Sequence, residues 1–382
     1  MYARPPGVPP SCRDRLREVD RWEWRVADGG DPATSLAQLA QRWGLGSWWS
    51  PSVPHDETPG SVCGMAILVG AAAGAYMVSG ATGSPSPAAA VPDVAAVVYA
   101  HGEGVMAPMP IPMAFSAHGW TSSWSEPEHA AAVDAVRSHI ADGTVYQVNM
   151  VGHQRSRWSG SAQAAADAVA AVEGAHWAGS IAGTDWAVAS GSPECFLTVE
   201  DGHIATYPIK GTAPATARGR QQLAVSVKER AEHVMIVDLQ RNDISRVARP
   251  GTVSVPQLFA IRSWAHLWQA ESTVRAQLEF GFGLADVLRA MCPPGSVTGT
   301  PKATALETIA DLEPVGRGPS MGALGFLTGQ RLALGLTIRT IALEPDWVHL
   351  WAGGGITWRS DPDAEVREAH AKALGVRNTL GG

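Results

Sequence analysis

The sequence predicts an α+β fold, in which runs of strands are separated from runs of helices. After residue 126, helical and strand-like segments follow one another in blocks rather than in strict βαβ order. Of the 382 residues, 45% are hydrophobic, which is enough to build a large core and excludes wholesale disorder. The net charge of −7 and the lack of a long Lys/Arg run argue against a nucleic-acid surface or a polybasic membrane anchor.

The chain divides into an uneven first part and a more regular second part. In residues 1–125, Pro-rich ends and an Ala/Pro/Ser stretch over 84–92 predict loops between short strands. The most apolar window, 65–79, is too short for a membrane span, which needs about 20 apolar residues, and we interpret it as buried strands. We expect residues 1–125 to pack on a catalytic region formed by residues 126–382.

Periodicity and turn residues predict the elements of the second part. In order, the predicted elements are helix 127–141, strand 145–151, helix 161–175, strands 186–189, 195–199 and 203–207, helices 221–247, 284–291 and 301–312, strands 321–327, 332–343 and 348–352, and helix 362–374. Pro127 suits the start of the first helix, and Arg249-Pro250-Gly251 ends the long one.

The four cysteines, Cys12, Cys63, Cys195 and Cys292, are far apart and form no C-x-x-C. This spacing suits neither a zinc site nor a disulfide framework, and indicates a reduced chain. The N-terminus lacks the charged-then-apolar pattern of a secretory signal. We therefore expect a soluble, cytoplasmic protein.

Two pairs of glutamates are candidate metal ligands. Glu229 and Glu232 share one face of the long helix, and Glu365 and Glu368 repeat this spacing on the last helix, with Lys372 one turn further. Like charges at this spacing weaken a helix unless a positive charge lies between them. Two such faces that meet would suit Mg²⁺, which takes one or two carboxylates with water. The alternative is two solvated helix faces.

Lys210 and Glu194 are candidate catalytic residues. Lys210 lies in PIKGT (208–212), between a strand end and a glycine turn, where a desolvated amine could act as a nucleophile. Glu194 follows Ser192-Pro193 at another strand start and could act as a general acid if burial raises its pKa. The alternative for Lys210 is an ordinary surface lysine.

Two glycine-rich segments, 294–299 and 353–355, could offer backbone N–H groups to an anion. Arg339, on a strand between them, could hold a carboxylate through two hydrogen bonds. The alternative is that both segments are ordinary turns.

Together these segments resemble the chorismate-utilising enzymes, which include anthranilate synthase component I, aminodeoxychorismate synthase component I, isochorismate synthase and salicylate synthase. The resemblance covers about residues 126–378 and implies two facing, mostly antiparallel sheets flanked by helices, with the active site in the cleft. The matching segments are YQVN (146–149), SPE-x-FL (192–197), PIKGT (208–212), ERAEHVMIVDLQRND (229–243), PPGSVTGTPK (293–302), GALGF (322–326), IRT (338–340), GGGI (353–356) and DPDAEVREAHAKA (361–373).

Two positions distinguish the chemistries of this family. Isochorismate and salicylate synthases have a lysine base where this chain has Gln147, and a neutral amide is a poor base, so the resemblance favours ammonia over water as the nucleophile. Anthranilate synthases have alanine where this chain has Lys210, whereas aminodeoxychorismate synthases carry PIKGT, whose lysine attacks C2 of chorismate.

The resemblance implies a role for each site residue. Mg²⁺ is held by Glu232 and Glu368, with Glu229 and Glu365 in the outer shell, and binds the ring carboxylate. Glu194 protonates the departing C4 hydroxyl, Lys210 adds at C2, and ammonia then attacks C4. The remaining assignments are Lys372, Thr298 and Gly299 to the ring carboxylate, Arg339, Gly354 and Gly355 to the enolpyruvyl carboxylate, and His266 to a place near the ring.

The chain also departs from the family pattern. An arginine-containing turn is replaced by Ala213-Pro214-Ala215, and Ser320 stands where a tyrosine is expected to contact the enolpyruvyl group. No Cys-His-Glu glutaminase set is visible, so we expect ammonia to come from a separate glutamine amidotransferase subunit or from solution. The alternatives are an anthranilate- or aminodeoxyisochorismate-forming enzyme, or a non-catalytic relative.

Overall fold

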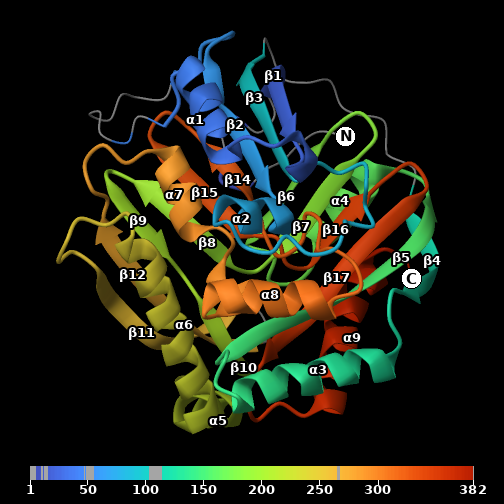
Figure 1. The fold of residues 1–382 in the computed structure, drawn as a ribbon. Coiled ribbons are helices and arrows are strands. Elements are labelled where there is room, and N and C mark those ends of the chain that lie inside the picture. Colours follow the sequence, from blue (N-terminus) through green and yellow to red (C-terminus); the bar gives the residue numbers. More distant parts are fainter. Residues whose placement is uncertain are drawn as a thin grey trace.

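The computed structural model describes residues 6–9, 12, 16–46, 48, 56–102, 114–264 and 267–381. Within these residues the chain forms two antiparallel sheets with helices around them (Figure 1). The α+β prediction is therefore confirmed.

The larger sheet has ten strands among the described residues. In spatial order they are β1 (Leu16–Trp24), β3 (Val94–His101), β2 (Val62–Val69), β14 (Ala323–Leu327), β15 (Arg331–Leu336), β8 (Cys195–Glu200), β9 (His203–Thr206), β12 (Leu267–Gln277) and β10 (Ile209–Pro214), with β11 (Ser254–Trp264) paired to β12. Because β2 pairs with both β3 and β14, the N-terminal strands extend the same sheet that carries β8 and β10. A division of the chain at residue 125 stays a prediction.

The smaller sheet has seven strands in the described part of the chain. They are β13 (Gly299–Thr300), β5 (Gln147–Ser159), β17 (Trp347–Ile356), β16 (Thr340–Leu343), β7 (Ala187–Ser192) and β6 (Trp177–Ala182), with β4 (Ser116–Ser122) paired to β5. The alignment of β17 with β5 places Gly355 opposite Asn149.

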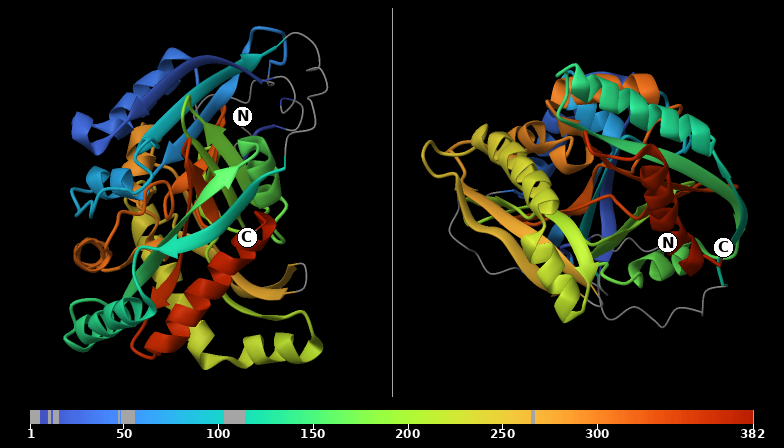
Figure 2. Two further views of the ribbon diagram at one scale, coloured as in Figure 1. Left: turned by 90° about the vertical axis from the view of Figure 1, so that its right-hand side faces the viewer. Right: turned by 90° about the horizontal axis from the view of Figure 1, so that it is seen from below.

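Helices surround the sheets. They are α1 (Pro32–Arg42), α2 (Ala71–Met77), α3 (Glu126–Ala141), α4 (Ala162–Ala170), α5 (Ala217–Val225), α6 (Val227–Ser245), α7 (Leu284–Met291), α8 (Lys302–Leu312) and α9 (Pro362–Thr379), with short 3₁₀ turns η2 (Val26–Asp28) and η3 (Gly295–Val297). In the view from below in Figure 2, α6 (yellow) and α9 (red) lie on opposite sides of the lower end of the molecule.

Two expected elements are each divided in the structure. The predicted helix 221–247 is two helices, because Ser226 leaves helical geometry (φ −68°, ψ 108°) and its side chain accepts the backbone N–H of Glu229, which starts α6. The predicted strand 332–343 is β15 of the larger sheet and β16 of the smaller sheet, separated where Arg339 takes a positive φ of 50°.

The apolar window 65–79 is only partly a strand. β2 ends at Val69, and Gly70 then begins α2, so the interpretation of the whole window as strands is wrong. The helix lies so close to residue 293 that a Cβ on Gly74 would approach the Cα of Pro293 to 3.0 Å. Gly74 therefore allows α2 to pack closely against Pro293.

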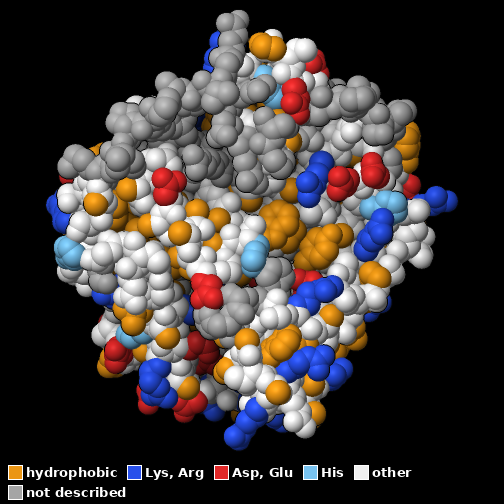
Figure 3. Space-filling view, turned by 180° about the vertical axis from the view of Figure 1, so that it is seen from behind, with side chains coloured by type: hydrophobic (Ala, Val, Ile, Leu, Met, Phe, Trp, Pro, Cys, Tyr) orange, Lys and Arg blue, Asp and Glu red, His pale blue; other side chains and the backbone are white. Residues whose placement is uncertain are grey.

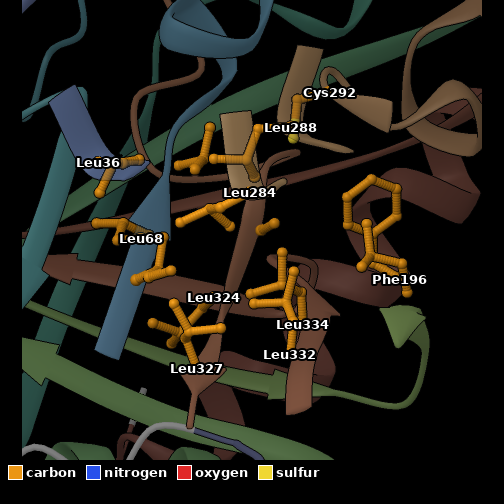
Figure 4. Packing of buried hydrophobic residues seen from close by; sticks show 14 of the residues in the cluster. Leu36, Leu68, Phe196, Leu284, Leu288, Cys292, Leu324, Leu327, Leu332 and Leu334 are labelled. Carbon is orange, nitrogen blue, oxygen red and sulfur yellow. The ribbon is translucent and has the colours of Figure 1, made fainter. Parts of the chain in front are cut away.

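The main core lies between the larger sheet and the helices α1 and α7. Figure 4 shows Leu68 of β2 and Leu324 of β14 beneath Leu36 of α1 and Leu288 of α7, and all four side chains are buried. Viewed from behind, acidic and basic side chains are interspersed on the surface (Figure 3). Among the described residues, no helix has the length and apolar character needed to cross a membrane.

Candidate active site

A cleft of about 550 Å³ lies between the two sheets and is bordered by α6 and α9. This volume is typical of small-molecule sites. Many of the charged side chains predicted for the site line this cleft, together with Lys228: they are Glu194, Lys210, Glu229, Glu232, Arg339, Glu365, Glu368 and Lys372.

Two chain crossings between the sheets deliver Glu194 and Arg339 to the cleft. Residues 193–194 connect β7 of the smaller sheet to β8 of the larger one, and residues 337–339 connect β15 to β16. The crossings lie side by side, because the backbone N–H of Leu336 donates to the carbonyl of Glu194 at 3.1 Å. At each crossing the chain therefore passes from one sheet to the other and presents a charged side chain to the cleft.

Burial changes the charge states of Glu194 and Lys210. Removal from water raises the pKa of the Glu194 carboxyl to about 7, although Lys210 and a hydrogen bond from the backbone N–H of Ile209 oppose this rise. Burial lowers the pKa of Lys210, although Glu194 opposes the change. Near neutral pH, the site therefore holds a carboxyl that can donate a proton and an amine that is easier to deprotonate than a free lysine.

The backbone around Lys210 is supported by His233, which the sequence reasoning did not single out. His233 Nδ1 lies 3.4 Å from the carbonyl oxygen of Lys210, and its Nε2 lies 2.5 Å from Ser272 Oγ. The next residue, Gly211, has φ +82°, and a Cβ there would lie 3.0 Å from Oε2 of Glu229. The sequence offered one indication of this role: His233 directly follows Glu232, so both residues lie on the same helix of the site.

The four predicted glutamates meet across the cleft from two helices. Burial raises the pKa of Glu232, with further contributions from the negative charges of Glu229 and Glu365, and Lys228 and Lys210 oppose the rise. Burial likewise raises the pKa of Glu365, and the charge of Glu368 adds to the effect. Half-buried carboxylates that raise each other's pKa make a site that favours a cation.

The donor set fits a divalent cation that takes few protein ligands. Among the described residues, no three of these carboxylates bring an oxygen each within 4.8 Å of one another. Mg²⁺ commonly binds through one or two carboxylates and keeps several waters, so it does not need a tighter cluster. A Cβ at Gly354 would lie 3.2 Å from Oε2 of Glu365 and 3.8 Å from Oε1 of Glu368. Because Gly354 has no side chain, there is room beside it for these carboxylate oxygens.

Lys372 is already engaged by protein groups. Its Nζ lies 2.7 Å from Oε1 of Glu368 and donates to the carbonyl of Gly353 at 2.9 Å. Burial tends to raise the pKa of Glu368, but the charge of Lys372 and the hydrogen bond from it outweigh burial and lower this pKa. Glu368 is therefore an ionised ligand candidate, held by Lys372 near the glycine strand, as we call Gly353–Gly355 of β17.

Gln147 and Gly299 lie behind the wall of the cleft. Gln147 is buried, and a Cβ at Gly355, which does line the cleft, would lie 2.2 Å from its Nε2. Gly299 of β13 pairs with Val148 of β5, and a Cβ on Gly299 would lie 2.3 Å from the carbonyl oxygen of Gln147. Gln147 therefore packs behind Gly355 and Gly299 packs on β5, and neither residue lines the cleft.

The other predicted substrate ligands differ in their placement. Arg339 lines the cleft, donates to the carbonyl of Glu173 at 3.0 Å, and has its pKa lowered by burial. Thr298 and Ser320 are buried outside the lining, where their hydroxyls donate to the carbonyls of Pro294 and Thr337. His266 lies outside the described residues.

Comparison with known proteins gives the same family. Residues 80–377 match the family described as chorismate binding enzyme. The chain is 37% identical to aminodeoxychorismate synthase component 1 of Salmonella typhimurium over 268 residues, which cover 68% of this chain and 59% of the relative. It is 35% identical to anthranilate synthase component 1 of Streptomyces coelicolor over 263 residues, 67% of this chain and 52% of the relative.

The fold is similar to the crystal structure of anthranilate synthase component I from Streptococcus pneumoniae, with a TM-score of 0.78 and 21% identity over 95% of this chain and 91% of that chain. Because the family match covers most of the sequence, the chain belongs to the chorismate binding enzyme family. The match spans 59% of the length of the Salmonella relative, which is less than two thirds of that protein.

Proposed function

We propose, from its membership in this family, that the chain aminates chorismate at C4 to form 4-amino-4-deoxychorismate. The observation that carries this proposal is the electrostatic pairing of Lys210 with Glu194 in the cleft. A buried lysine whose pKa is lowered is a nucleophile, and a buried carboxyl with a pKa of about 7 is a general acid at neutral pH. The similarity to aminodeoxychorismate synthase component 1 supports the same reaction.

The two residues would act in one displacement and its reversal. The neutral amine of Lys210 forms a bond to C2, the ring double bonds shift, and the C4–O bond breaks as Glu194 supplies the proton with which the hydroxyl leaves as water. Ammonia then forms a bond to C4, the double bonds return, and the C2–N bond to Lys210 breaks. Chorismate and ammonia give aminodeoxychorismate and water, so no oxidant or reductant is needed.

Glu232 and Glu368 are the residues that we propose to hold Mg²⁺, with Glu229 and Glu365 next to them. When bound, Mg²⁺ would offset the negative charge of the ring carboxylate. Arg339 and the N–H groups of the glycine strand remain to hold the enolpyruvyl carboxylate, which suits a guanidinium at the cleft surface. In this proposal Lys372 acts through Glu368, to which its ammonium is bound.

We also propose that ammonia comes from a glutamine amidotransferase subunit. A glutaminase nucleophile must be an accessible thiolate, yet all four cysteines of this sequence are buried. Burial also raises the pKa of the thiol of Cys292 to about 12. The name component 1 that the Salmonella and Streptomyces relatives carry fits a two-subunit enzyme.

Mass spectrometry of the product tests the proposal. The protein is incubated with chorismate, Mg²⁺ and ammonium, with and without an aminodeoxychorismate lyase, and aminodeoxychorismate is the expected product. Anthranilate fluorescence without the lyase would instead support anthranilate synthesis, which the similarity to the Streptomyces relative makes the second candidate. No consumption of chorismate under any ammonia supply would leave a non-catalytic family member.

A further inference from the structure

Two thiols and an imidazole meet inside the N-terminal end of the larger sheet, outside the cleft. One donor atom each from Cys12, Cys63 and His101 lies within 4.8 Å of the others. The three residues are at most 1% exposed. Their sequence separation concealed this cluster, because the chain returns to the same place only through the folding of β1, β2 and β3.

The register of the strands explains the meeting. The pairing of β2 with β3 slips between Val62 and Gly64, so Cys63 is an extra residue at a bulge, which turns its side chain out of the regular alternation. His101 ends β3, and its N–H donates to the carbonyl of Ser61 at 2.9 Å. The backbone N–H of Cys12 donates to the carbonyl of Pro9 at 3.0 Å.

The donor types select a soft or borderline cation. Thiolates and imidazole are the ligands of structural zinc sites, whereas Mg²⁺ prefers oxygen. Tetrahedral zinc, with Zn–S of about 2.3 Å and Zn–N of about 2.0 Å, separates its donors by roughly 3.5–3.8 Å. The three donors therefore need only a small contraction to reach a common ion, and one coordination position stays for a water or a carboxylate.

We propose that Cys12, Cys63 and His101 bind one zinc ion that fastens the N-terminal segment to β2 and β3. The role is structural, since the three ligands come from three places far apart in the sequence and are buried away from the cleft. This site is separate from the proposed chorismate cleft, so its test does not depend on that reaction. The larger sheet begins at β1 and ends at β10, which carries Lys210, and the cluster lies at the β1 end.

Metal content of the wild-type chain tests the proposal directly. The full chain is reduced, stripped with a chelator, equilibrated with zinc, desalted and analysed for metal. We expect one zinc per chain and, after replacement by cobalt, the thiolate-to-cobalt charge-transfer band that carboxylate ligands do not give. Failure of the reduced chain to retain zinc overturns the proposal, whether its thiols are free or Cys12 and Cys63 have formed a disulfide.

Variants locate the ion. Cys63→Ser should lose the retained zinc and the cobalt band, and Cys292→Ser should keep both, because the buried thiol of Cys292 is not one of the three donors that lie within 4.8 Å of one another. Glu232→Gln should also keep both, which separates this site from the carboxylates of the cleft. Retention of the band by Cys63→Ser overturns the assignment, and the wild-type measurement stays decisive if that variant does not fold.

Discussion

The buried carboxyl of Glu194 and the ammonium of Lys210 interact in the cleft, and burial moves their pKa values toward each other. The pKa of Glu194 rises to about 7 and that of Lys210 falls. Near neutral pH the proton can therefore lie on either group at a smaller free-energy difference than in water. This relationship gives the site an acid and a nucleophile at the same pH.

Replacement of Lys210 by alanine should abolish detectable aminodeoxychorismate formation, because no other amine is proposed to form the bond to C2. Lys210→Arg is the matched control for charge, since it keeps a cation but not a neutral amine. Both variants are assayed by mass spectrometry of the product. If either retains a near-normal rate, the covalent role of Lys210 is wrong.

Replacement of Glu194 by glutamine should lower kcat by about 10²–10⁴-fold, the usual contribution of a general acid. In the wild type, the protonated fraction of Glu194 falls as pH rises through about 7, so the rate should fall on the alkaline side. On the acid side the rate should fall as Lys210 becomes protonated. The pH profile of kcat checks this, and persistence of the alkaline limb near pH 7 in Glu194→Gln would assign that limb to another group.

The same carboxyl predicts a pH-dependent effect on stability. The folded-state pKa of Glu194 is raised above its ordinary value of 4.5, so its contribution to stability is full below pH 4.5 and is lost as pH rises through about 7. Glu194→Gln should therefore gain melting temperature relative to the wild type at pH 8 and not at pH 4.5. Thermal unfolding at both values checks this, and an equal difference at both would show that Glu194 does not titrate differently on folding.

Magnesium should stabilise the chain through the cleft glutamates. A ligand at 100 times its Kd adds about 2.7 kcal/mol, and bound Mg²⁺ would also relieve the mutual repulsion of Glu232 and Glu365. Glu232→Gln should raise the Mg²⁺ concentration needed for stabilisation and turnover. Glu307→Gln changes an exposed residue of α8, and this variant should need the same Mg²⁺ concentration as the wild type. Turnover that survives EDTA unchanged would remove the metal from the mechanism.

The sequence pattern predicted most elements because their hydrophobic periods are local properties. It missed the change of sheet within 332–343, since β15 and β16 have the same apolar character and only the positive φ of Arg339 marks the crossing. The break between α5 and α6 could have been predicted from the sequence, because Ser226 lies three residues before Glu229, which is the pattern of a capped helix start.

The charged residues of the site were predictable for a related reason. Glu229 and Glu232 share a helix face, and the resemblance to a family joined them to the distant pair on α9. Burial of a polar side chain depends on contacts that lie far away in sequence, so the positions of Thr298 and Ser320 outside the cleft could not be read from the pattern. Lys228 could have been predicted as a site residue, because it lies one helical turn before Glu232. Its Nζ lies 3.8 Å from Oε1 of Glu232.

A buried ion pair behind the cleft predicts a positioning role for Arg317. Its guanidinium binds both carboxylate oxygens of Glu313, at 2.8 and 2.6 Å. It also donates to the carbonyls of Val297 and Asn149, at 2.8 and 2.6 Å, and both of those residues line the cleft. Arg317 therefore fastens η3 to β5 at this wall of the cleft.

Arg317→Met should lower the free energy of unfolding by about 3–5 kcal/mol, because it leaves the carboxylate of Glu313 buried without its partner. The matched control is Asp134→Ala, which breaks a partly exposed ion pair with Arg137 at 2.7 Å. This control should change the free energy of unfolding by less than about 1 kcal/mol. Urea unfolding measures both. The double variant Arg317→Met, Glu313→Leu removes the unpaired charge and should recover stability but not the KM for chorismate, since the carbonyls of Val297 and Asn149 stay unfastened. Full recovery of KM in the double variant would show that the pair contributes to folding alone and not to the shape of the cleft wall.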